Sequence, residues 1–258
     1  MKLSLPNPCF TKLCAMAIGV TLTGILTNCP AQAVSLITQR EDVQADDQVD
    51  WGSLDFGISI PIAPATTAKL LPYSFTSNTE KGFAYSVNIP NPQNSRYTPP
   101  FIFSVNPFVP VNFSLGDAVL FTGFIPSNFP AVGNPGPITI NFDSPVFAVG
   151  TQIGVDDSFQ YDAFISAFDS QNNLLGSFSL PGIPPLNGID NSALFLGIRS
   201  ETANIAKITI SSTEPNRALG INFLSIRRTL IPEPSTILAV SILGLGMIGS
   251  KTRKIGNC

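Results

Sequence analysis

Carboxylates are the main side chains in this sequence that could do chemistry. Histidine is absent from all 258 residues, and residues 34–231 contain no cysteine. These absences exclude Ser-His-Asp and Cys-His catalysis, histidine-based zinc sites and histidine general bases. A pair of acids could still hydrolyse a glycosidic bond. The candidate acids are Asp156 or Asp157, paired with Asp162, Asp169 or Asp190.

Each of these acids lies in a turn-like setting, where aspartate is favoured because its side chain bonds the local backbone. The chain has 19 Phe against one Trp and four Tyr, which favours core packing over sugar-stacking platforms. We therefore predict a non-enzymatic protein without a metal or cofactor, and keep a carboxylate-dependent glycan hydrolase as the alternative. Packing is also the preferred interpretation for the remaining aromatic candidates, which are Trp51, Tyr73, Tyr85, Tyr97 and Tyr161.

Residues 34–50 are rich in acids among polar neighbours, which predicts a solvated, mobile arm. Calcium binding by these acids is the alternative, but their spacing lacks the glycine and terminal glutamate of a helical calcium loop. Residues 34–231 carry 9 Lys and Arg against 16 Asp and Glu, a net charge of −7. Nucleic acid is therefore excluded as a partner for this surface. The acids of the arm are Glu41, Asp42, Asp46, Asp47 and Asp50.

The elements that must position these side chains are predicted to be short β-strands. Alternating apolar and polar residues occur at 138–142, 177–180 and 208–210, whereas no helical period is sustained over three turns. Asp169–Asn173 separates residues 164–168 from residues 174–178 and predicts a hairpin turn. Many short strands without alternating helices favour an all-β, antiparallel, jelly-roll-like β-sandwich over residues 51–229.

Residues 134–226 resemble the β-sandwich domains that often precede a particular bacterial sorting tail, and that look like galactose-binding and carbohydrate-binding modules. The order of strand-like runs carries this resemblance, from Gly136-Pro137-Ile138 to Gly220-Ile221-Asn222. Many members of that group have an aspartate where this chain has Asn222. The resemblance therefore does not transfer a ligand or ion role to this position.

The C-terminal segment 230–258 has the features of a membrane-inserted tail. Residues 235–250 are 16 uncharged residues, which as a helix would rise about 24 Å against a hydrocarbon core of about 30 Å. The basic end 251–258 carries Lys251, Arg253 and Lys254, which predict a cytoplasmic C-terminus with the main domain outside. Before the helix, Pro232 and Pro234 flank Glu233 and favour an extended, accessible peptide.

This arrangement of Pro232-Glu233-Pro234, a short apolar helix and a basic end resembles the PEP-CTERM tail of bacterial envelope proteins. The resemblance implies that a membrane-embedded exosortase recognises and cleaves the tail. An ordinary membrane anchor that happens to contain Pro-Glu-Pro is the alternative. The span is short and contains three glycines, so it suits a transient handle for processing better than a lasting anchor.

Residues 1–33 have the pattern of a secretory signal peptide. Lys2 and Lys12 precede an apolar stretch, and Ala31 and Ala33 supply the small residues that signal peptidase recognises, with cleavage predicted after Ala33. A lipoprotein acylated at Cys29 is the alternative, although Asn28 occupies a position that normally holds a small residue.

Taken together, these patterns predict an exported protein that is anchored in the membrane and then reaches the cell surface or the medium after processing. The predicted partners are signal peptidase, exosortase and extracellular polysaccharide or envelope matrix. Besides the glycan hydrolase, a purely structural coat protein is the second alternative.

Overall fold

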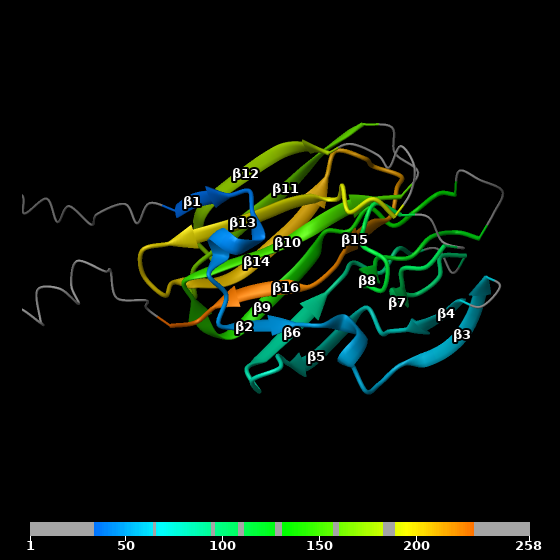
Figure 1. Cartoon of the computed structure of the whole chain (residues 1–258), viewed down its shortest axis with the longest axis horizontal. Coiled ribbons are helices and arrows are strands. Elements are labelled where there is room, and N and C mark those ends of the chain that lie inside the picture. Colours follow the sequence, from blue (N-terminus) through cyan, green and yellow to red (C-terminus); the bar gives the residue numbers. More distant parts are fainter. Residues whose placement is uncertain are drawn as a thin grey trace, which may run out of the picture. The chain divides into compact units, whose positions relative to one another are not determined.

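The computed structural model describes residues 34–63, 66–93, 96–107, 111–126, 131–156, 160–182 and 189–229. Within these ranges the chain forms β-strands and two short 3-10 helices without an α-helix, which confirms the predicted all-β class (Figure 1). The predicted signal peptide and sorting tail, with all of their named residues, lie outside the described residues. Among the residues described, no helix is long and apolar enough to cross a membrane.

The described strands form two antiparallel sheets. The first follows the order β1-β13-β10-β15-β8-β7-β4-β3, and β16 lies between β10 and β2. Its strands are β1 (Val34–Ile37), β2 (Asp47–Val49), β3 (Ile58–Ala63), β4 (Thr66–Leu70), β7 (Phe101–Ser104), β8 (Ala118–Phe121), β10 (Ala148–Val155), β13 (Leu194–Ser200), β15 (Leu219–Ile221) and β16 (Leu224–Arg227).

The second sheet follows the order β12-β11-β14-β9-β6-β5. The hairpin predicted around Asp169–Asn173 is confirmed, since β11 and β12 pair antiparallel on either side of it. The period-two segments at 138–142, 177–180 and 208–210 are likewise parts of β9, β12 and β14. The strands of this sheet are β5 (Ser74–Asn78), β6 (Ala84–Asn88), β9 (Ile138–Val146), β11 (Tyr161–Phe168), β12 (Leu174–Gly182) and β14 (Ile205–Ser212).

One apolar core joins side chains of both sheets. Ile153 and Leu196 from the first sheet belong to the same buried cluster as Ile140, Ile165 and Ile208 from the second. In β11, buried residues alternate with more exposed ones, because successive side chains of a strand point to opposite faces. The alternation predicted at 138–142 likewise places the core on β9, where Ile138, Ile140 and Phe142 are buried.

Residues 34–50 do not form the predicted solvated arm. β1 pairs with β13, the 3-10 helix η1 (Arg40–Val43) packs on β10 and β13, and β2 pairs with β16. Val43 and Val49 are almost fully buried. The prediction failed because a strand at a sheet edge needs only a few apolar contacts once its backbone is paired, and the many acids concealed those contacts.

The pairing of β2 with β16 brings the beginning and the end of the described chain together. Figure 1 shows β2 (blue) beside β16 (orange), with η1 in front of the first sheet. The second 3-10 helix, η2 (Trp51–Ser53), follows β2 and buries Trp51 completely. Asp46, directly before β2, and Arg228 and Thr229, directly after β16, belong to the candidate site.

Candidate functional site

Asp46 holds the two residues that follow β16. Its carboxylate accepts hydrogen bonds from the backbone N–H of Arg228 (2.8 Å), from the backbone N–H of Thr229 (2.9 Å) and from the Thr229 hydroxyl. Partial burial opposes ionisation, but these hydrogen bonds prevail and lower the pKa of Asp46 below its ordinary value. Only Leu230 and Ile231 separate this contact from Pro232 in the sequence.

Asp47 points inward on the same segment and is fully engaged. Its side chain is 0% exposed and pairs with Nη1 of Arg228 at 3.2 Å. The same carboxylate accepts hydrogen bonds from the Thr79 hydroxyl and from the backbone N–H groups of Gln48 and Lys81. A buried carboxylate with four donors is well compensated, so this ion pair fixes Arg228 in place.

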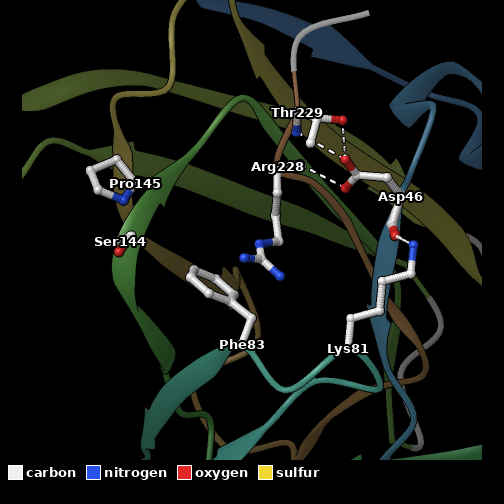
Figure 2. A pocket seen from close by; sticks show the side chains of 7 residues that line it. All are labelled: Asp46, Lys81, Phe83, Ser144, Pro145, Arg228 and Thr229. Carbon is white, nitrogen blue, oxygen red and sulfur yellow. Dashed lines mark hydrogen bonds between the residues drawn. The ribbon is translucent and has the colours of Figure 1, made fainter.

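A pocket with a volume of about 310 Å³ opens beside this pair. Figure 2 shows the side chains of Phe83, Lys81 and Ser144 around the Arg228 guanidinium. The volume is at the lower end of small-molecule sites, which span about 300–1,000 Å³. The lining residues are Asp46, Lys81, Phe83, Ser144, Pro145, Arg228 and Thr229.

The guanidinium of Arg228 is the dominant polar group of this pocket. It lies 4.2 Å from the ring centroid of Phe83, which is within the range of a cation–π contact. Phe83 in turn stacks on Phe142 with ring centroids 6.2 Å apart. The ion pair with Asp47 and the aromatic stack together restrict the rotamers of Arg228, so its position is set before any ligand arrives.

Of the predicted catalytic acids, none that the structure describes lines this pocket. Asp162 and Asp169 are at opposite ends of β11, seven residues apart, which in an extended strand corresponds to about 23 Å. Asp169 bonds the backbone and side chain of its own turn, and Asp190 bonds Ser192. Asp156 follows β10, whereas Asp157 lies outside the described residues. Asp46 is the carboxylate that lines the pocket, so the described part of the chain does not place two acids there.

The aromatic candidates serve mainly as packing. Trp51, Tyr85 and Tyr161 are 3% exposed or less, and the ring of Trp51 meets the ring of Tyr85 edge-on. Tyr73 and Tyr97 are half-buried. The expectation of packing is thus confirmed for the three buried rings.

Asn222 is the centre of a buried polar network on the first sheet. Its Oδ1 accepts from Arg40 (3.0 Å) and from the backbone N–H of Gln152 (3.2 Å). Its Nδ2 donates to Asp117 (2.9 Å) and to Oε1 of Gln152 (2.6 Å). Burial lowers the pKa of Arg40, and the nearby carboxylates of Asp117 and Glu41 partly offset this effect. Asn222 therefore fastens η1 to the sheet.

Within the described ranges, no group of three or more His, Cys, Asp or Glu residues is placed to hold a metal ion. The predicted site residues Ala31, Ala33, Pro232, Glu233, Pro234, Lys251, Arg253 and Lys254 lie outside these ranges.

The pocket was not predicted from the sequence, because its residues come from four distant segments. The sequence carried one faint signal, the two adjacent cations Arg227 and Arg228 directly before the tail.

No family model matches the chain, and no curated protein matches it. Among solved structures, it is similar to a DUF4465 family protein from Bacteroides caccae ATCC 43185, with 10% identity and a TM-score of 0.37 over 75% of this chain and 100% of that chain. It is also similar to the enzymatically active domain of bacteriophage CBA120 tailspike protein 4, with 12% identity and a TM-score of 0.19 over 63% of this chain and 18% of that chain. At these TM-scores neither likeness carries an argument about function.

Proposed function

We propose that this protein is an exported, exosortase-sorted surface or secreted protein whose jelly-roll-like β-sandwich binds extracellular polysaccharide without catalysis. The observation that carries the proposal is the C-terminal pattern of Pro232-Glu233-Pro234, an uncharged stretch of 16 residues and a basic end. Signal peptidase would release the N-terminus, and the membrane would hold the tail until exosortase acts on it.

Two structural features support the sorting half of the proposal. Val34, the first residue after the predicted signal-peptidase cut, already pairs with Ser200 of β13. At the other end, β16 is paired on both sides and Asp46 holds Arg228 and Thr229. The domain would therefore keep both of its terminal strands after the leader and the tail are removed.

The binding half rests on the pocket and on the surroundings of the acids. The pocket offers the guanidinium of Arg228, the hydroxyl of Ser144 and apolar walls, which suit a polar ligand that is held without being cleaved. Glycoside hydrolysis needs two acids at opposite sides of one bond. Among the described candidates, Asp169 and Asp190 are bound within their own turns, and Asp162 lies at the opposite end of β11 from Asp169.

Retention on polysaccharide tests the binding half directly. The mature protein, purified from its native host, would be passed over immobilised polysaccharide extracted from the same envelope, with and without competing soluble polymer. We expect retention that soluble polymer reverses, and no shortening of the polymer during contact. Elution in the void on every envelope polysaccharide would contradict the binding proposal, and shortened polymer would favour the hydrolase.

A further inference from the structure

We infer that the pocket beside Phe83 binds the carboxylate of a uronic acid unit in an acidic polysaccharide, with Arg228 as its main contact. This inference rests on the proposed polysaccharide interaction and names the substrate class of the same pocket. Some charged groups near the pocket are already engaged by the protein, whereas part of the Arg228 guanidinium is still open to a ligand.

The negative charges near the pocket are engaged by the protein itself. Asp47 is buried beneath four donors, and Asp46 uses both of its oxygens to bond residues 228 and 229. Lys81 donates its ammonium to the backbone carbonyl of Asp46. The two carboxylates therefore act as structural groups, and their orientation is set by hydrogen bonds that a ligand would have to break.

The guanidinium of Arg228 is only partly engaged. Its Nη1 bonds Asp47, whereas Nε and Nη2 have no hydrogen bond to any described residue, and the side chain is 37% exposed. A planar guanidinium binds a carboxylate through two parallel N–H donors, and this geometry is stronger and more selective than a point charge. The open donors thus match one carboxylate, which carries a single negative charge.

The remaining walls fit a sugar ring that carries such a carboxylate. Phe83 and Pro145 supply apolar surface, and Ser144 supplies a hydroxyl that can donate or accept. A doubly charged group such as a phosphate suits the site less well, because the carboxylate of Asp46 lines the same pocket.

Binding to alginate, a polymer of uronic acids, and to the neutral glucan dextran tests the inference on the mature protein. We expect retention on alginate that exceeds retention on dextran by about tenfold, as expected for one charge-assisted hydrogen bond or more. Arg228→Lys keeps the charge but loses the planar fork, and should weaken alginate binding by about tenfold.

Ser144→Leu provides a second test, because it fills the exposed wall of the pocket and leaves the Arg228–Asp47 pair intact. It should also reduce alginate binding, even if Arg228→Lys proves unstable. The matched control is Lys207→Gln, since Lys207 is another cation over a phenylalanine ring, 4.0 Å from the centroid of Phe168, and does not line this pocket. This control should bind like the unchanged protein.

The outcomes separate the inference from the proposed function. Retention on alginate that Arg228→Lys weakens by about tenfold and Ser144→Leu also reduces, with Lys207→Gln unaffected, supports the inference. Equal retention on alginate and dextran, or alginate binding that is unchanged in both pocket variants, overturns the inference. If envelope polysaccharide is still retained, the proposed function stays in place. Absence of retention on every polysaccharide overturns both.

Discussion

The substitution Asn222→Asp should destabilise the domain at neutral pH, because it turns two buried hydrogen-bond donors into an acceptor. Asn222 is 1% exposed. Its Nδ2 donates to Asp117 at 2.9 Å and to Oε1 of Gln152 at 2.6 Å, and both acceptors would then face a carboxylate oxygen. Gln152 cannot simply turn its amide, because its Nε2 already donates to Asn191 and to the carbonyl of Ala193.

The expected loss in free energy of unfolding is about 3 kcal/mol at neutral pH. Two lost donors and a repulsion from Asp117 set its size, while the guanidinium of Arg40, 3.0 Å from Oδ1, offsets part of it. Burial and the charge of Asp117 should raise the folded-state pKa of the introduced carboxyl above its unfolded value of about 3.9. Because this folded pKa is raised, the penalty is smallest below the unfolded pKa and grows as the pH rises through it.

Urea unfolding at about pH 4 and about pH 7.5 measures this penalty, with the emission of the single tryptophan, Trp51, as the probe. The matched control is Asn141→Asp, since half-buried Asn141 donates one side-chain bond, to Ser86 at 3.2 Å. The control should lose less than about 1 kcal/mol. A variant Asn222→Asp that unfolds like the unchanged protein at both pH values would show that the network is not as tightly constrained as the distances indicate.

Four further outcomes follow from the same structure. Trp51→Phe should lose about 1–2 kcal/mol, because the indole N–H bonds the carbonyl of Asn222 at 2.7 Å, and thermal melting by circular dichroism checks this. Ile140→Ala should lose about 3 kcal/mol in urea unfolding, since Ile140 is fully buried in the shared core. Burial raises the pKa of Tyr85 and Tyr161 to about 12. The free energy of unfolding should therefore be unchanged below the unfolded-state pKa of about 10, and should fall between about pH 10 and 12. Tyrosinate absorbance should show that these two rings ionise only when the domain unfolds. Asp46→Asn should speed hydrogen exchange at the backbone amides of Arg228 and Thr229, which bond this carboxylate. In the unchanged protein the pKa of Asp46 is lowered, so the protection of these amides should persist above the unfolded-state pKa of about 4 and fade as the pH drops below it.

The fold class could be predicted from the sequence because strand periodicity is local. The alternation at Ile138, Ile140 and Phe142 places buried side chains on one face of β9, and Asp169–Asn173 has the composition of the turn that it forms. Residues 34–50 were misjudged because pairing of their backbone with β13 and β16 depends on strands that lie more than 140 residues away. Composition alone does not report such pairing.

The pocket could not be predicted for a related reason. Arg228 becomes a candidate binding residue only because β2 and β16 pair, which places Asp47 beneath it. Phe83, which directly precedes β6, then contacts its guanidinium. None of these side chains belongs to a recognisable motif. The sorting tail, by contrast, could be predicted from the sequence alone, because its pattern consists of consecutive residues.

Replacing Pro232-Glu233-Pro234 by three alanines in the native host tests the central claim most directly, with cell fractionation and intact-mass measurement of the protein as the readout. We expect the unchanged protein to lose its C-terminal segment and to reach the cell surface or the medium, whereas the variant should keep the segment and stay in the membrane fraction. A variant with the same mass loss and the same location as the unchanged protein would contradict the assignment of this segment as an exosortase sorting tail.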